Sequence, residues 1–323
     1  MELLYLGIIM RPYKHKIISF LIASIFASTG LAQAQNAKIT NTTPALTPYK
    51  GETFDKIKNS GKLIIGYRSS SVPISFLNED KKPIGSGVDI CVAIAGKIKN
   101  KLAMQNLEVK FVEVNSTNRI PLTVSGEIDL ECGSTTNNAV RREQVDFSIP
   151  YYIAGIRILT KTNSGINYLN DLRGKKVSVG DKTSSIVLLE KLSKERDMKI
   201  SLVIEKDFPT AFAAVKTGKA DAFVLDDLLL FGERSKVPDP QNYTVVGDFL
   251  SVEPLAIMLR KNDPKFKTFV DKEMINLINN GEINIIYKKW FMSPIPPNNQ
   301  NLGIPQSALL KDVFRMPTSI VGN

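Results

Sequence analysis

The sequence predicts an α/β protein of two lobes, each a mostly parallel sheet flanked by helices, with two crossover strands as the hinge. Three observations support this prediction. Strand-like and helix-like segments alternate from residue 53 onward, the alternation restarts after residue 171, and a long extended segment follows each series. Alternating strands and helices give parallel sheets covered on both faces. A chain of 323 residues is long enough for two such units.

The N-terminus precedes this pattern and has the features of an export signal. Basic residues are followed by an apolar run at 17–31 and by Ala32-Gln33-Ala34, a small-x-small cleavage pattern. A membrane anchor would need a longer apolar run. Residues rich in Thr, Pro and Asn follow. The predicted parts are a signal peptide at 1–34, a flexible linker at 35–52, lobe 1 at 53–153 and 254–323, and lobe 2 at 154–253.

Cleavage after Ala34 would remove His15, the only histidine of the chain. The remaining chain then lacks the residue on which Ser-His-Asp sites, Cys-His sites and most zinc sites depend. We therefore expect no metal and no cofactor. The formal net charge is +10, but the lysines are spread along the sequence without interleaved aromatic residues. This pattern favours a solvated basic surface over nucleic-acid binding.

Two cysteines lie in the exported part, Cys91 and Cys132. In an oxidising compartment an even number favours one disulfide. It would close a loop of 41 residues (132 − 91), worth about 4 kcal/mol in the chain-entropy description. The alternative is two buried thiols.

The elements of the first series follow from hydrophobic periodicity. Apolar residues recur at helical spacing in 88–102, whereas 107–114 alternates as a strand does. Gly126 marks the end of a short helix. The expected order is helix 54–61, strand 62–67, helix 88–102, strand 107–114, helix 118–127 and strand 128–132.

The second series repeats the pattern. Its expected order is strand 175–180, helix 184–194, strand 200–204, helix 210–219, strand 220–225 and helix 226–236. Segments 151–161 and 252–264 read as the two crossovers. Helices at 264–281 and 282–291, a Pro/Asn-rich tail and a short helix at 307–314 complete the chain.

The segment 129–142, DLECGSTTNNAVRR, carries the clearest chemical signal. It joins a strand end, a run of hydroxyl residues and an arginine, and Arg119 lies ten residues upstream. Hydroxyls, a backbone N–H at a helix start and a guanidinium suit one planar carboxylate. The pattern predicts a pocket for a small acid.

Five strings in order carry a resemblance to a known family. They are RSSSVPISF, NSTNRIPL, ECGSTTNN, VLDDLLLFGER and KKWFMSPIPP, within residues 53–316. With them the chain resembles the periplasmic solute-binding proteins of ABC transporters for polar amino acids, in the glutamate/aspartate branch. The resemblance implies a type II-like periplasmic-binding-protein fold and a monomer in the periplasm. It further implies that the protein delivers an acidic amino acid to an inner-membrane ABC permease.

The resemblance also implies roles for single residues. The α-carboxylate of the ligand would meet Ser134, Thr136 and Arg141, with Thr183 and Ser184 added from lobe 2. Its ammonium would meet Asp226, and the distal carboxylate would meet Arg68, Ser116 and Arg119. Phe208 stands where relatives often have a histidine near the distal carboxylate. Loss of that donor is expected to shift the preference between aspartate and glutamate, or toward an amide or another dicarboxylate.

Charge balance agrees with these roles, because an unpaired buried charge costs several kcal/mol. Three arginines against Asp226 give an expected site charge of +2, which favours a dicarboxylic amino acid. Each residue also has a structural alternative. Arg119 could cap a carbonyl or pair with Glu113, Asp226 could cap the following helix, and of Arg141 and Arg142 one is expected at the surface.

A second hypothesis is an enzyme on the same scaffold, a dehydratase acting on a cyclic dicarboxylic acid. Its candidate acids are Glu131 and Asp226. Glu131 precedes Cys132 on a predicted strand and is expected to face away from the cleft, and Asp226 suits an ammonium better than a keto acid. We therefore expect a binding protein and not an enzyme.

Overall fold

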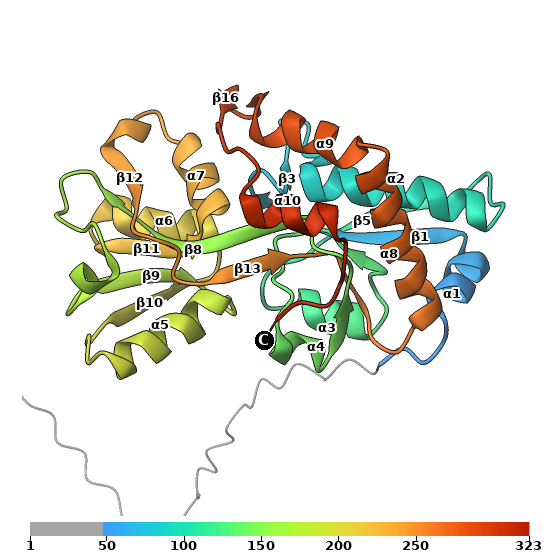
Figure 1. The fold of residues 1–323 in the computed structure, drawn as a ribbon, viewed down its shortest axis with the longest axis horizontal. Coiled ribbons are helices and arrows are strands. Elements are labelled where there is room, and N and C mark those ends of the chain that lie inside the picture. Colours follow the sequence, from blue (N-terminus) through green and yellow to red (C-terminus); the bar gives the residue numbers. More distant parts are fainter. Residues whose placement is uncertain (1–47, 323) are drawn as a thin grey trace, which may run out of the picture. The chain divides into compact units, whose positions relative to one another are not determined.

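The computed structural model describes residues 48–322. The predicted signal peptide and residues 35–47 of the predicted linker lie outside these residues. The described residues form two large sheets, each flanked by helices (Figure 1), and two small sheets of two and three strands. Within residues 48–322, no helix combines the length and the apolar character that a membrane span requires.

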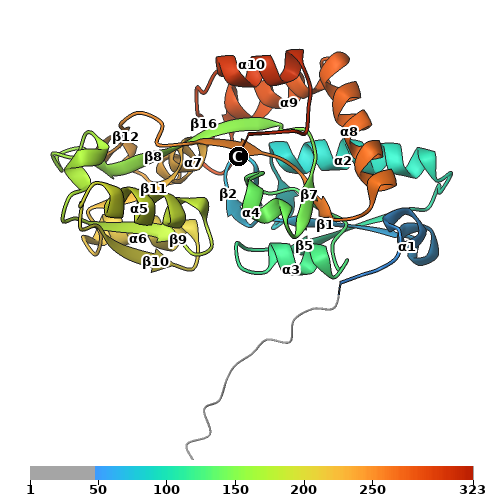
Figure 2. The ribbon, with the colours of Figure 1, turned by 60° about the horizontal axis from the view of Figure 1, so that its bottom comes forward.

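The first sheet has the strand order β5-β1-β6-β14-β7. β1 lies parallel to both β5 and β6, while β14 is antiparallel to β6 and β7. Helices α2, α8 and α9 lie on one side of this sheet and α3 on the other (Figure 2). The strands are β1 (Lys62–Tyr67), β5 (Glu108–Glu113), β6 (Leu130–Glu131), β7 (Val145–Phe147) and β14 (Met258–Arg260). The helices are α1 (Thr53–Ser60), α2 (Ser86–Lys101), α3 (Arg119–Val124), α4 (Ala139–Arg142), α8 (Pro264–Asn279) and α9 (Glu282–Phe291).

The second sheet has the order β10-β9-β11-β8-β12, and β13 also pairs with β8. β9 is parallel to β10 and β11, whereas β8 is antiparallel to its neighbours. α6 and α7 pack into one hydrophobic cluster and α5 into another. The strands are β8 (Tyr152–Lys161), β9 (Lys176–Gly180), β10 (Ser201–Glu205), β11 (Ala222–Asp226), β12 (Tyr243–Val246) and β13 (Val252–Leu255). The helices are α5 (Ser184–Glu195), α6 (Phe208–Thr217) and α7 (Asp227–Ser235).

These elements confirm the two-lobed α/β prediction. The parallel part of each sheet comes from the strand–helix alternation, and the antiparallel part comes largely from β8, β13 and β14, which lie in the predicted crossovers. The short strands β2 (Ser70–Ser71), β3 (Ser75–Leu77) and β4 (Pro83–Ile84), which form a small sheet of their own, were not expected. Nor were β15 (Pro294–Ile295) and β16 (Gln300–Asn301). The short helix predicted near the C-terminus is α10 (Ala308–Arg315).

The two crossover segments run beside each other. β13 pairs with the first half of β8, from Val252 opposite Gly155 to Leu255 opposite Tyr152. Two residues after β13 ends, the chain enters β14 in the first sheet. Two antiparallel strands thus connect the sheets, as expected for a hinge. The lobe boundaries at 153/154 and 253/254 stay a prediction.

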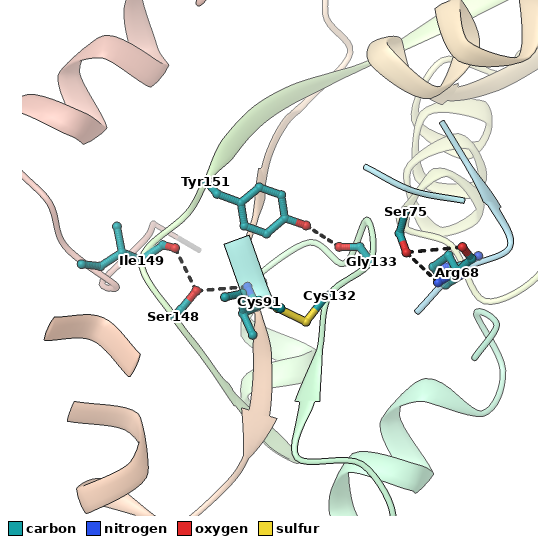
Figure 3. The surroundings of a disulfide bond; sticks show 9 residues. Arg68, Ser75, Cys91, Cys132, Gly133, Ser148, Ile149 and Tyr151 are labelled. Atoms are coloured by element: carbon teal, nitrogen blue, oxygen red, sulfur yellow. Dashed lines mark hydrogen bonds between the residues drawn. A yellow bond between two sulfur atoms is a disulfide. The ribbon is translucent and has the colours of Figure 1, made fainter. Parts of the chain in front are cut away.

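The predicted disulfide between Cys91 and Cys132 is confirmed, with a Cα–Cα distance of 6.4 Å. Cys91 lies on α2 and Cys132 directly follows β6, so the bond ties a covering helix to the end of a central strand (Figure 3). Both cysteines are fully buried. The residue after Cys132 is Gly133, where the candidate site begins.

Reduction of this bond is expected to lower the free energy of unfolding by about 4 kcal/mol, because the unfolded chain regains the entropy of a 41-residue loop. Urea unfolding with and without reductant measures the difference. A paired Cys91→Ala, Cys132→Ala variant should match the reduced protein. Equal stability of the oxidised and reduced proteins would contradict the expectation.

Candidate functional site

Four charged residues predicted for the site lie where strands end and helices begin. Arg68 directly follows β1, Arg119 is the first residue of α3, Arg141 lies on α4, and Asp226 is the last residue of β11. Because the carboxyl ends of parallel strands lie at one edge of a sheet, such positions converge. All four side chains are buried, with 3–8% exposure. None of them points into open solvent.

Arg68 is held on two sides. Its Nη2 donates to the Oγ of Ser116 at 3.1 Å, and its guanidinium lies 5.2 Å from the ring centre of Phe208. The backbone N–H of Arg68 donates to Ser75 Oγ at 2.8 Å (Figure 3). Burial, together with the nearby charge of Arg119, lowers the pKa of Arg68 to about 10. Phe208, which stands where relatives often have a histidine, thus makes a cation–π contact with Arg68.

Arg119 belongs to the same cluster. Burial lowers its pKa, and the carboxylates of Glu131 and Asp226 act in the opposite direction. Glu113, the alternative partner, is exposed, whereas Arg119 is only 3% exposed. The Nε of Arg119 has no hydrogen-bond partner within residues 48–322. A pairing of Arg119 with Glu113 is therefore not what the structure shows.

Arg141 is the buried member of the Arg141–Arg142 pair, as the sequence led us to expect. Its Nη1 donates to the backbone oxygen of Thr136 at 2.9 Å, and its backbone N–H donates at 3.0 Å to Oδ1 of Asn138, the N-cap residue of α4. Burial and the charge of Arg119 lower the pKa of Arg141 to about 9, with Glu253 acting in the opposite direction.

Asp226 is the buried anion of the cluster. It occupies the N-cap position of α7 but makes no side-chain capping bond, so capping does not explain it. Burial raises its pKa well above the ordinary value, and the carboxylate of Glu253 adds to this effect. The guanidinium groups of Arg141 and Arg119 oppose it. A cationic group bound beside Asp226 would therefore stabilise the ionised form of its carboxyl group.

The predicted hydroxyl residues divide into two groups. Ser116, Ser134 and Thr136 are buried, and Ser134 Oγ donates to Ser71 Oγ at 3.2 Å. Thr183 and Ser184 are half-buried at the start of α5, with Thr183 Oγ1 donating to the carbonyl oxygen of Gly180 at 2.7 Å.

Ser184 and Thr136 line a common cavity of about 690 Å³, together with Glu253 of β13. The side chains of Thr183 and Phe208 lie close together, since both lie within 3.2 Å of the position that a Cβ at Gly180 would occupy. Ser184 thus shares a cavity with Thr136, and Thr183 lies near the ring of Phe208 that contacts Arg68.

Glu131 was expected to face away from the cleft, and this expectation was wrong. Its side chain is fully buried, and its charge acts on Arg68, Arg119 and Arg141. The reason is strand alternation. Its neighbours Leu130 and Cys132 point into the hydrophobic core, so Glu131 points the other way, toward the arginines.

The expected site charge of +2 counted only three arginines and Asp226, and the structure adds Glu131 and Glu253, whose carboxylates act on Arg119 or Arg141. The three guanidinium groups are then matched by three carboxylates, those of Glu131, Glu253 and Asp226, and the formal charges sum to zero. Glu253 could be found from sequence only by pairing the crossovers. Glu253 pairs with Ala154 of β8, and Asp226 pairs with Ile156 of β8. Because Ala154 and Ile156 are two residues apart on one strand, Glu253 and Asp226 lie on the same face of the sheet.

Two further observations complete the chemistry. Tyr151 donates its hydroxyl to the carbonyl oxygen of Gly133 (Figure 3), and burial together with Glu131 raises its pKa well above the ordinary value. Within residues 48–322, no group of three or more His, Cys, Asp or Glu side chains is arranged to hold a metal ion. What the cluster can offer is charge-assisted hydrogen bonding to an anionic and a cationic group.

Comparison with known proteins places the chain in a family. Residues 63–293 match the bacterial extracellular solute-binding proteins, family 3. The chain is 40% identical over 296 residues to the glutamate/aspartate import solute-binding protein of Escherichia coli (strain K12), covering 92% of this chain and 95% of that protein. It is 40% identical over 267 residues to the L-glutamate/L-aspartate-binding protein of Pseudomonas aeruginosa, covering 82% and 88%.

A solved structure supports the same placement. The crystal structure of the ancestral amino acid-binding protein AncCDT-1, described as a precursor of cyclohexadienyl dehydratase, superposes with a TM-score of 0.64 at 29% identity. The match covers 74% of this chain and 99% of that one. The family match and the 40% identical relatives together show that this chain belongs to the bacterial extracellular solute-binding proteins, family 3.

Proposed function

We propose that this protein captures glutamate or aspartate between its two lobes and delivers it to an ABC permease. The observation that supports this most is a second pair of buried guanidinium groups, Arg68 and Arg119, beside Arg141 and Asp226. Arg68 Nη1 and Arg119 Nε are buried without a hydrogen-bond partner in the described part of the chain. Buried donors of this kind are normally satisfied, so they call for an acceptor.

The zwitterionic part of an amino acid accounts for the other pair. Its α-carboxylate would accept from Arg141 and from the hydroxyls of Ser134 and Thr136, and its ammonium would donate to Asp226. A neutral side chain would then leave Arg68 and Arg119 facing an uncharged group. A distal carboxylate gives both guanidinium groups a charged acceptor, which is the stronger kind of hydrogen bond.

The names of two similar proteins support the choice of ligand, since both are described as binding glutamate and aspartate. Membership of an extracellular solute-binding family supports export to the periplasm by the predicted signal peptide at 1–34. An inner-membrane permease is the partner that an import protein of this type requires. We infer that the protein acts as a monomer.

Closure of the lobes is the motion that would enclose the ligand. The guanidinium of Arg68 lies over Phe208 of the other lobe, and Lys236 Nζ donates to the backbone oxygen of Ser70 at 3.3 Å. Such contacts form only when the sheets approach each other. Two adjacent antiparallel connections, β8 and β13, suit a hinge that opens the lobes.

The enzyme hypothesis is less well supported. Burial of Glu131 beside the arginines supplies a carboxylate that a dehydratase could use, but the two relatives named above are described as import or binding proteins. Asp226 also has a simpler role as partner of an ammonium. Turnover of prephenate or arogenate would revive the enzyme hypothesis.

A thermal-shift screen of the twenty amino acids tests the proposal broadly. A ligand that binds only the folded protein raises its melting temperature in proportion to the logarithm of its excess over Kd. Glutamate and aspartate are expected to give the largest shifts. A large shift with a neutral or basic amino acid, and none with either acidic one, would reject the proposal.

Binding is also expected to weaken on acidification. The ammonium stabilises ionised Asp226, whose pKa in the ligand-free protein is raised by burial and by Glu253. Below that pKa each binding event must release a proton, so affinity falls by up to about tenfold per pH unit. Calorimetry between about pH 7 and about pH 5, in two buffers of different ionisation enthalpy, measures both effects. Proton uptake, or tighter binding at the lower pH, would contradict this expectation.

A further inference from the structure

We propose that Glu131 is a specificity-determining counter-ion, whose fixed negative charge limits how strongly the site prefers a distal carboxylate over an amide. The inference rests on the proposed function, because it concerns the ligand group that Arg68 and Arg119 would meet. The position of Glu131 and its lack of partners support the proposal.

The backbone fixes Glu131 at the centre of the first sheet. β6 lies between β1 and β14, with Glu131 opposite Gly66 on one side and Met258 on the other. The side chain is 0% exposed. Gly133 is required next to it, since a Cβ there would collide with Glu131 Oε1 and with Arg68 Cγ. The carboxylate and the stem of Arg68 therefore pack against the same backbone.

The interaction of Glu131 with its surroundings is one of charge. Both carboxylate oxygens are buried without a hydrogen-bond partner within residues 48–322. The carboxylate nevertheless acts on the charges of Arg68, Arg119 and Arg141. A buried anion is tolerated only near opposite charge, and here that charge is the arginine cluster. Glu131 thus offsets part of the positive field without occupying the free guanidinium donors.

This placement has a consequence for selectivity. The distal carboxylate of glutamate would enter the field that Glu131 already occupies, and two like charges in one buried site repel each other. The amide of glutamine carries no net charge and escapes this repulsion. The charge of Glu131 therefore weakens glutamate binding more than glutamine binding, and its removal should widen the difference.

Two uncharged variants test the proposal. Glu131→Gln keeps the shape, and Glu131→Met removes hydrogen bonding as well, so a common result reports on charge alone. We expect glutamate affinity to rise at least about tenfold in both, or about 1.4 kcal/mol, while glutamine affinity changes less than about threefold. Isothermal titration calorimetry measures the Kd for glutamate. The weaker Kd for glutamine is measured by titrating glutamate into protein that is already saturated with glutamine.

Glu233→Gln is the matched control. Glu233 is a buried carboxylate, 3% exposed, but it pairs with Lys236 at 2.6 Å on α7. Its removal should lower stability and leave the glutamate-to-glutamine ratio unchanged.

The outcomes separate the inference from the proposed function. An unchanged or lower glutamate-to-glutamine preference in the folded variants would overturn the inference while the wild-type protein still bound glutamate. Failure of both variants to fold would also overturn it, since the charge would then serve the fold. A wild-type protein that bound neither glutamate nor aspartate would instead reject the proposed function.

Discussion

Replacement of Arg119 by alanine is expected to weaken glutamate and aspartate binding by about 3–5 kcal/mol, roughly two to three and a half decades in Kd. Arg119 is 3% exposed, and its Nε lacks a partner within residues 48–322. Its loss would leave the buried distal carboxylate with one guanidinium, that of Arg68. Glutamine, which brings no charge, should lose far less. Titration calorimetry with glutamate, aspartate and glutamine measures the three changes.

Arg157→Ala provides the control for this variant. Arg157 is a half-buried arginine on β8 whose guanidinium donates to the carbonyl oxygens of Gly247 and Val245, at 2.9 and 3.3 Å. Its removal changes the net charge equally but should leave ligand affinity unchanged. Equal losses for glutamate and glutamine in Arg119→Ala would show that Arg119 serves the pocket as a whole and not the distal carboxylate.

Replacement of Asp226 by asparagine is expected to weaken the binding of every amino acid by a similar factor of roughly two to three and a half decades. The ammonium group is common to all of them, and Asp226 is the buried carboxylate that Arg141 and Arg119 act on. The glutamate-to-glutamine ratio should therefore stay close to that of the wild-type protein. Asparagine has no carboxyl proton to release, so the variant should also lose the release of a proton that accompanies ligand binding.

Asp129→Asn separates this effect from a general loss of stability. Asp129 is 3% exposed and pairs with Lys56 at 2.8 Å in the first lobe. Its replacement should lower the melting temperature without changing Kd at a temperature where the variant is folded. Tight ligand binding by Asp226→Asn would contradict an ammonium role for Asp226.

Much of the fold could be predicted because its elements are long and periodic. α2 and α8 each show apolar residues at helical spacing, and Gly61 with φ 69° ends α1 where the sequence places a glycine. The strands that escaped prediction have two to four residues, such as β2, β7 and β12. Segments this short carry too little periodicity to be recognised, and their partners are distant in sequence.

The candidate site was predictable in its cations and less so in its anions. Arg68 and Arg119 lie within two of the family strings, Arg141 lies three residues beyond a third, and the structure buries all three. Glu131 lay within one of those strings but was assigned to the wrong strand face. Glu253 lies on a crossover strand, where only the pairing with β8 reveals which face a residue occupies.

Phe208 stands where relatives often have a histidine, near the proposed position of the ligand's distal carboxylate. A histidine would offer the distal carboxylate a hydrogen-bond donor, whereas Phe208 offers only its ring to Arg68. The distal group then depends more heavily on the two arginines and Ser116. Phe208→His is expected to change the glutamate-to-aspartate ratio more than the total affinity for acidic ligands, and competition between the two ligands would measure it.

Calorimetric titration of the wild-type protein with L-glutamate, L-aspartate and L-glutamine is the most direct test of the central claim. The claim is that Arg68 and Arg119 make the pocket selective for a second carboxylate. We predict that glutamate or aspartate binds at least about a hundredfold more tightly than glutamine, equivalent to about 2.7 kcal/mol. Tight binding of glutamine with no detectable binding of either acidic amino acid would contradict it.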